Sequence, residues 1–122
     1  MLVNGDRALL LRAICNLLHN AVKYSPPATT IVLDLRARDA MVQCVVIDQG
    51  YGIDPGDIPD LFVRCHRGRA QDRGDAEGSG LGLALVKAVA DKHGGHIAVT
   101  SERGRGSRFE LSIPQTRQTG FD

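Results

Sequence analysis

One stretch organises the whole sequence: Asn16-Leu-Leu-His-Asn-Ala-Val-Lys-Tyr-Ser25. On an α-helix, positions 16, 20, 23 and 24 stand at i, i+4, i+7 and i+8 and therefore share one face. That face presents two carboxamides, an ammonium and a phenol together. Carboxamide oxygens suit a divalent cation that stays mostly hydrated, and an ammonium suits phosphate. An ordinary amphipathic helix explains the stretch equally well, so the rest of the chain must decide.

The helix around this stretch is expected to begin after Asp6, whose carboxylate can accept N–H groups of the first turn. Ser25-Pro26-Pro27 should stop it near Tyr24. Several apolar residues fall on flanks that can be buried against a core, namely Leu10, Ile14, Leu17, Leu18 and Ala21.

Two alternating or β-branched segments follow the helix. Residues 29–38 predict a half-buried strand with Leu33 and Leu35 on its inner side, and residues 41–48 predict a more central one. The short Asp39-Ala40 connection favours a hairpin between them. Residues 97–101 and 107–113 predict two further strands, and Leu2-Val3 a short edge strand.

The remaining segments predict helices and one loop. A short helix is expected at 57–62, and a second long helix is expected to begin at 78–82 and to end at Gly94-Gly95. Residues 64–79 hold four arginines and almost no apolar side chain, which predicts a mobile loop. These elements indicate an α+β fold in which about five strands, mixed but mainly antiparallel, are covered on one face by about three helices.

Composition bounds the function only loosely. The 122 residues suffice for one domain, expected over residues 1–114 with a flexible tail at 115–122. A net charge of +1 gives no reason to expect nucleic acid or an anionic membrane as a partner. No apolar run approaches the roughly 18 residues that span a bilayer. Cys15 and Cys44 lie among apolar neighbours in the sequence, so both are expected to be buried in the core as reduced thiols. The protein is therefore expected in a reducing compartment, the cytoplasm.

Two glycine-containing motifs indicate further possible binding sites for a ligand. In Asp48-Gln-Gly-Tyr-Gly52, a carboxylate that ends an apolar row lies beside a glycine-lined floor. Such a carboxylate can accept a hydrogen bond from an amine of a flat ring such as adenine, although a turn-capping aspartate is the simpler alternative. Gly78-Ser-Gly-Leu-Gly82 can cradle a phosphate at a helix start, or can be a flexible loop entering a helix.

The motifs together are far more specific than each alone. Their order, over about a hundred residues, resembles the catalytic ATP-binding domain of sensor histidine kinases in the GHKL (Bergerat) superfamily. The matching positions are Asn16, Asn20, Lys23, Tyr24, Asp48, Gly50, Gly52, Phe62, Arg67, Gly78, Gly80, Gly82, Gly104 and Gly106. The resemblance covers about residues 6–114 and implies a two-layer α/β sandwich that holds ATP between its helices and a lid.

The resemblance also implies roles for individual residues. Asn20 matches the asparagine that binds Mg²⁺, and Asn16, Lys23 and Arg67 match the catalytic positions around the phosphates. Asp48 is similar to the aspartate that reads adenine. The other nucleotide-binding positions implied are Tyr24, Gly50, Gly52, Ile53, Phe62, Gly78, Gly80, Leu81 and Gly82.

The sequence departs from the family pattern at Cys65 and His66, where the family usually has aromatic residues. The packing of the lid is therefore in question, and His66 is interpreted as a substituted packing residue. The other three histidines are expected at helix surfaces or core edges, since no three histidines or cysteines have metal-ligand spacing.

The leading hypothesis is a kinase domain that transfers the γ-phosphoryl group of Mg-ATP to a histidine of a separate phosphoacceptor domain, which then serves a response regulator. An ATP-hydrolysing clamp is the nearest alternative, but its relatives have glutamate where Asn16 stands, and an amide cannot accept a proton. A serine kinase of the anti-sigma type and a nucleotide-binding module without catalysis are further alternatives. We expect the isolated domain to be monomeric, and to be part of a longer, possibly membrane-anchored sensor.

Overall fold

The computed structural model describes residues 3–62 and 81–116, without the side chain of Leu81. The predicted loop at 64–79 and most of the predicted tail lie outside these ranges. Within them, no helix is long and apolar enough to cross a membrane.

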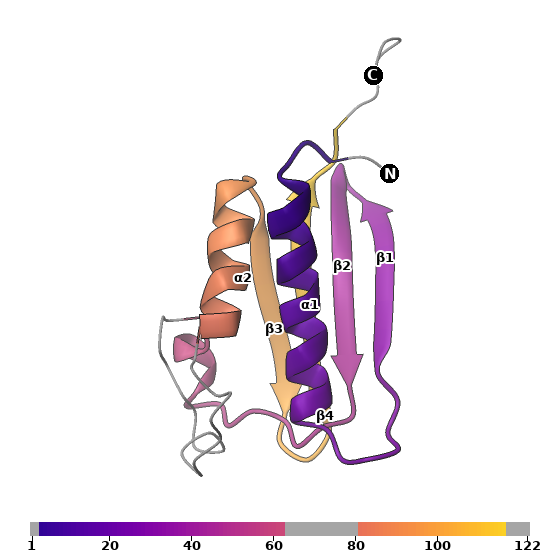
Figure 1. Cartoon of the computed structure of the whole chain (residues 1–122). Coiled ribbons are helices and arrows are strands. Elements are labelled where there is room, and N and C mark those ends of the chain that lie inside the picture. The colour runs from indigo at the N-terminus through magenta and orange to yellow at the C-terminus, as the bar shows by residue number, and fades with distance from the viewer. Residues whose placement is uncertain (1–2, 63–80, 117–122) are drawn as a thin grey trace.

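A four-stranded antiparallel sheet forms one layer of the described structure (Figure 1). Its strands are β1 (Val32–Arg38), β2 (Met41–Asp48), β3 (His96–Glu102) and β4 (Gly106–Pro114), in the order β1-β2-β4-β3. The predicted α+β class is thus confirmed, with pairings that are antiparallel throughout instead of mixed. In place of a fifth strand, Val3 forms an isolated bridge with Gln115.

Two α-helices, α1 (Arg7–Lys23) and α2 (Leu81–Lys92), cover one face of this sheet, and a short 3₁₀ helix, η1 (Ile58–Asp60), stands where a longer helix was predicted. The predicted caps are confirmed. The Asp6 carboxylate accepts the Leu9 N–H at 3.0 Å, and α2 ends with Gly94 at φ +73° and a 2.8 Å bond from the Gly95 N–H to the Ala90 carbonyl.

The core lies between the helices and the sheet. Both helices contribute small or branched residues, and Cys44, as predicted, is buried among them, which raises the pKa of its thiol to about 11. Cys15 was predicted to be buried and is exposed instead, because it lies on the flank of α1 and not on its core face. The buried core residues are Ala13, Leu17, Ala21, Cys44, Val46, Val86, Val89, Ala90, Phe109, Leu111 and Ile113.

The predicted hairpin joins β1 to β2. Asp39 and Ala40 take positive φ angles of 52° and 64°, as a two-residue type I′ turn requires, and Arg38 pairs with Met41 directly before and after it. The prediction that Leu33 and Leu35 are buried is wrong, since they are 45% and 52% exposed. The physical reason is position: β1 is the edge strand, and Figure 1 shows it beyond the side of α1.

His93 fixes the N-terminal end of α1 to the C-terminal end of α2. Its Nε2 accepts the Asp6 N–H at 2.9 Å, and its Nδ1 lies 2.7 Å from the Val89 carbonyl oxygen. Nε2 must therefore be unprotonated while Nδ1 donates. Gly5 allows this approach, because a Cβ there would fall on the His93 ring.

Candidate functional site

The ends of α1 and β2 meet at one end of the molecule, which is also the end where α2 begins (Figure 1). The Tyr51 N–H, just after β2, donates to the Tyr24 carbonyl oxygen at the end of α1 at a distance of 3.3 Å. This contact brings together the two motifs that the sequence singled out, the polar helix face and the Asp48 turn.

Asp48 is the buried charge of this site, at 6% exposure. Its Oδ1 accepts the Gly50 N–H at 2.8 Å and the Ser107 N–H at 3.2 Å. Burial raises the pKa of Asp48, and these two hydrogen bonds oppose the rise. Both bonds use Oδ1, and within the described residues Oδ2 accepts none. The carboxylate is therefore held through one oxygen, while the other oxygen has no hydrogen bond from the described residues.

Two glycines lie in the segment that follows this carboxylate, and Gly50 is the one in direct contact with it. A Cβ at Gly50 would lie 2.5 Å from the Tyr24 carbonyl oxygen and 2.8 Å from Asp48 Oδ1. Gly52 has φ +78°, and a Cβ there would fall on the Glu102 carbonyl oxygen. Only glycine fits at either position, so the chain can pass between the end of α1 and the β3–β4 turn.

Two serines that the sequence reasoning missed support the same turn. Besides the backbone bond from Ser107 to Asp48, the Ser107 hydroxyl lies 2.9 Å from the Ser101 hydroxyl. Ser101 Oγ in turn accepts the Ile53 N–H at 2.8 Å. A signal was present in the sequence: Ser107 stands two residues before Phe109 on the inward face of β4, where period two would place an apolar residue.

The polar face of α1 is confirmed as a structural feature. Asn16 Nδ2 donates to the Gly82 carbonyl in the first turn of α2, at 3.4 Å. Asn20 is half-buried, and its carboxamide makes no hydrogen bond within the described part of the chain. The Lys23 ammonium lies 5.4 Å from the centroid of the Tyr24 ring, and the Tyr24 hydroxyl is buried without a partner in the described ranges.

Ile53 and Phe62 join the site to the core. Both are partly buried and pack against the core cluster. The Phe62 ring meets the Phe109 ring edge to face, with centroids 6.4 Å apart and an interplanar angle of 84°. Phe62 thus anchors the segment that leads out of the described residues toward the predicted lid.

For four other predicted site residues the structure gives no side-chain geometry. Arg67, Gly78 and Gly80 lie outside the described residues, and Leu81 is placed as the first residue of α2 without its side chain. Cys65 and His66 also lie outside.

The donor set limits the kind of metal that could be held. Among the described residues, no three histidines, cysteines or acidic residues gather around one point. A single uncommitted carboxamide, that of Asn20, fits a hard ion that takes most of its ligands from phosphate and water.

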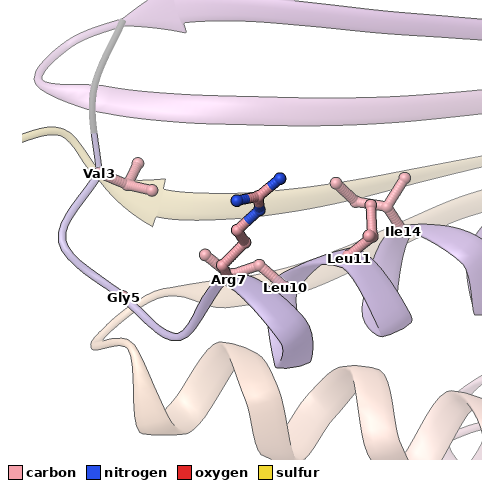
Figure 2. A pocket seen from close by; sticks show the side chains of 6 residues that line it. All are labelled: Val3, Gly5, Arg7, Leu10, Leu11 and Ile14. Atoms are coloured by element: carbon pink, nitrogen blue, oxygen red, sulfur yellow. The ribbon is translucent and has the colours of Figure 1, made fainter.

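A pocket of about 360 Å³ lies elsewhere, at the N-terminal end of α1 (Figure 2). Its lining is apolar except for Arg7, and no carboxylate or carboxamide side chain contributes to it. The candidate site is therefore placed at Asp48, where polar groups gather, and not at this apolar pocket.

Known proteins share both the sequence and the fold of this chain. Residues 5–117 match the family described as histidine kinase-, DNA gyrase B- and HSP90-like ATPase. The sensor-like histidine kinase SenX3 of Mycobacterium tuberculosis is 45% identical over 92% of the chain, and the sensor histidine kinase CusS of Escherichia coli K12 is 43% identical over 92%. The chain spans 27% and 23% of these two relatives.

Solved structures give the same result. The mycobacterial sensor histidine kinase MprB superposes with a TM-score of 0.81 at 37% identity, over 92% of this chain and 76% of that one. Full-length ShkA, solved in complex with AMPPNP, superposes with a TM-score of 0.72 at 30% identity, over 87% of this chain and 21% of that one. The chain therefore belongs to the histidine kinase-, DNA gyrase B- and HSP90-like ATPase family, as a catalytic ATPase domain of the kind that sensor histidine kinases carry.

Proposed function

We propose that this domain binds Mg-ATP and donates the γ-phosphoryl group to a histidine on a separate phosphoacceptor domain. The observation that carries the proposal is Asp48, buried at the end of β2 with Oδ1 held by two backbone N–H groups and Oδ2 uncommitted in the described structure. A rigid acceptor of this kind fits the exocyclic amine of adenine, whereas guanine presents a carbonyl oxygen at the same ring position and would meet a second acceptor.

The phosphates of the bound nucleotide are expected along the polar face of α1, between Asp48 and the start of α2. Lys23, at the end of α1, supplies a cation for them. Asn20 lies one turn before Lys23 and is proposed as the protein's ligand to Mg²⁺, whose charge would offset that of the phosphates. Arg67, Gly78, Gly80, Leu81 and Gly82 are proposed to complete the phosphate site when ATP is bound.

The role of Asn20 can be separated from adenine binding. Asn20→Ala should leave adenosine affinity nearly unchanged, because the side chain makes no hydrogen bond within the described residues that its loss would break. It should remove the part of ATP affinity that depends on Mg²⁺, which calorimetry with Mg²⁺ and with EDTA resolves. An equal loss of ATP affinity in EDTA would show that Asn20 holds something other than the metal.

The amide side chain of Asn16 favours transfer to a histidine over hydrolysis. Hydrolysis needs a base that takes a proton from water, and an amide accepts none at neutral pH. Asn16 also uses its N–H group on the Gly82 carbonyl, which suits a residue that joins α1 to α2. The chain should accordingly turn over ATP slowly by itself.

The experiment that tests the function mixes the 122-residue chain, ³²P-labelled ATP and a separately produced phosphoacceptor domain from the same parent protein. The phosphoryl group should leave ADP and form an acid-labile bond to the imidazole nitrogen of the added domain's histidine. Replacing that histidine with alanine is the control. Label on the isolated chain at a rate comparable to the mixture would contradict the proposal.

Cellular context follows from the same proposal. A response regulator would take the phosphoryl group from the phosphohistidine, and a site that uses ATP would face the cytoplasm of a longer sensor protein.

A further inference from the structure

Ser101 lies in β3, where the β3–β4 hairpin meets the segment that follows Asp48. Its hydroxyl makes three polar contacts. It accepts the Ile53 N–H at 2.8 Å, donates to the Gly106 carbonyl oxygen at 3.0 Å, and lies 2.9 Å from the Ser107 hydroxyl oxygen. One small side chain therefore joins the residues that leave β2 to both strands of the hairpin.

The number of protons fixes the direction of the contact between the two serines. A serine hydroxyl has one proton to donate and two lone pairs that accept. The proton of Ser101 is used on the Gly106 carbonyl, and the Ile53 N–H occupies one lone pair. Only a lone pair is left for the third contact, so the Ser107 hydroxyl must donate its proton to Ser101. The reverse direction would leave two acceptor oxygens, those of Ser101 and Gly106, 3.0 Å apart with no proton between them.

This direction determines what Ser107 can offer to a ligand at Asp48. The two residues are directly opposed in the β2–β4 pair, and the Ser107 N–H is bound to Asp48 Oδ1. Because its only hydroxyl proton is used on Ser101, the Ser107 oxygen has lone pairs alone for any further partner. The ionised Asp48 carboxylate likewise only accepts. The two neighbouring side chains therefore both present acceptors.

We propose that Ser101 is a positioning residue that determines which purine base the site accepts. By taking the proton of Ser107, it keeps the surroundings of Asp48 free of hydroxyl donors. Such surroundings favour an amine of the base and disfavour a carbonyl oxygen at the same place. The inference rests on the proposed function, since it concerns the nucleotide bound at Asp48, and it assigns to Ser101 a role that acts through Ser107.

Loss of the Ser101 hydroxyl has a consequence that ordinary weakening of the fold does not have. In Ser101→Ala, the Ser107 hydroxyl loses its acceptor and can rotate. It can then donate to a carbonyl oxygen as readily as it can accept from an amine. The variant should therefore discriminate less between bases, whereas a merely structural change would weaken the binding of all nucleotides to the same extent.

Calorimetry of the 122-residue chain with ATP and ITP tests this expectation. Inosine carries a carbonyl oxygen at the ring position where adenosine carries its amine, and it lacks the second amine of guanosine. The parent should prefer ATP, and Ser101→Ala should lower the ratio of ATP affinity to ITP affinity at least about threefold, the value of one neutral hydrogen bond. Ser101→Thr keeps a hydroxyl on a residue that suits a strand, and its ratio should stay within about twofold of the parent's.

Two further variants show whether Ser101 acts through Ser107. Ser107→Ala keeps the backbone N–H that binds Asp48 but has no hydroxyl, so adding Ser101→Ala to it should not change the ratio further. Ser112→Ala is the matched control. Ser112 is also a buried serine of β4, at 1% exposure, but its hydroxyl accepts the Gln43 amide on the other face of the sheet. Its removal should leave the ratio unchanged.

Hydroxyl proton exchange, followed by NMR on the parent without nucleotide, gives a test that depends on neither ligand nor substitution. The Ser107 hydroxyl proton should exchange slowly with solvent, because it is buried and bound to Ser101. Fast exchange of this proton, or a ratio that Ser101→Ala leaves unchanged in a parent that prefers ATP, would overturn the role of Ser101. Equal binding of ATP and ITP by the parent is a different result, which would contradict the adenine site of the proposed function itself.

Discussion

Asp48→Asn is expected to reduce ATP affinity by about ten- to a hundredfold without lowering the stability of the fold. The amide keeps an oxygen that can accept the N–H groups of Gly50 and Ser107, but it turns an N–H₂ group toward the ligand. An amine of adenine would then meet a donor in place of an acceptor, at a cost of about 1.5–3 kcal/mol. Calorimetry of the parent and the variant with ATP and GTP measures both the loss and the selectivity.

The expected effect of Asp48→Asn on stability follows from the pKa of Asp48. Burial raises this pKa in the folded state above its unfolded value, so ionisation opposes folding. Asp48 contributes fully to stability at pH values below its pKa in the unfolded chain, roughly 4, and this contribution is lost as the pH rises through its pKa in the folded state. At neutral pH, Asp48→Asn should therefore unfold at the same or a higher denaturant concentration than the parent, and the difference should shrink on acidification.

Asp54→Asn is the matched control. Asp54 Oδ1 accepts the Gly56 N–H at 2.9 Å, the same local bond that Asp48 makes to Gly50, but in an exposed setting. ATP affinity should stay within about twofold of the parent, as for most surface changes. Equal ATP and GTP binding by the parent, or equal losses in both variants, would remove Asp48 from the adenine site.

The sequence predicted those elements whose signals are local. Asp6 as a cap, Gly94 as a helix stop and the Asp39-Ala40 turn each depend on backbone chemistry within a few residues, and all are confirmed. The central position of β2 in the sheet was also predicted, because its segment is richer in β-branched residues than the segment before it.

The exposure of β1 could not be predicted in the same way. An alternating pattern says which residues share a face, but not whether a helix reaches across to cover that face. Leu33 and Leu35 do share the inner face, and they remain exposed because α1 packs further into the sheet. Cys15 illustrates the same limit on a helix, since apolar sequence neighbours do not determine which way a side chain points.

The sequence predicted the motifs that meet at the site, but it did not predict the serines that hold them in place. Asp48, Gly50 and the polar face of α1 do meet at one end of the molecule. Ser101 and Ser107 come from a hairpin more than fifty residues away, and only the strand register brings them to Asp48. Asp48 pairs with Ser107 directly, a long-range contact that no local pattern contains.

Gly106→Ala should therefore disrupt fold and site together. Gly106 has φ +97°, and a Cβ there would fall on the Asp48 carbonyl oxygen. Because backbone strain and a backbone clash act at once, we expect the free energy of unfolding to fall by about 3 kcal/mol or more, and ATP binding to weaken as the Asp48–Ser107 contact opens.

Gly104→Ala separates the two causes. Gly104 lies in the same turn with φ +81°, but a Cβ there would meet no atom within 4 Å. Gly104→Ala should therefore introduce backbone strain without a clash, which should lower the free energy of unfolding by about 1 kcal/mol. Its ATP affinity should stay close to that of the parent. Urea unfolding and calorimetry of both variants measure the pair. If Gly104→Ala were as damaging as Gly106→Ala, the close approach of β4 to Asp48 would not be what holds the site in place.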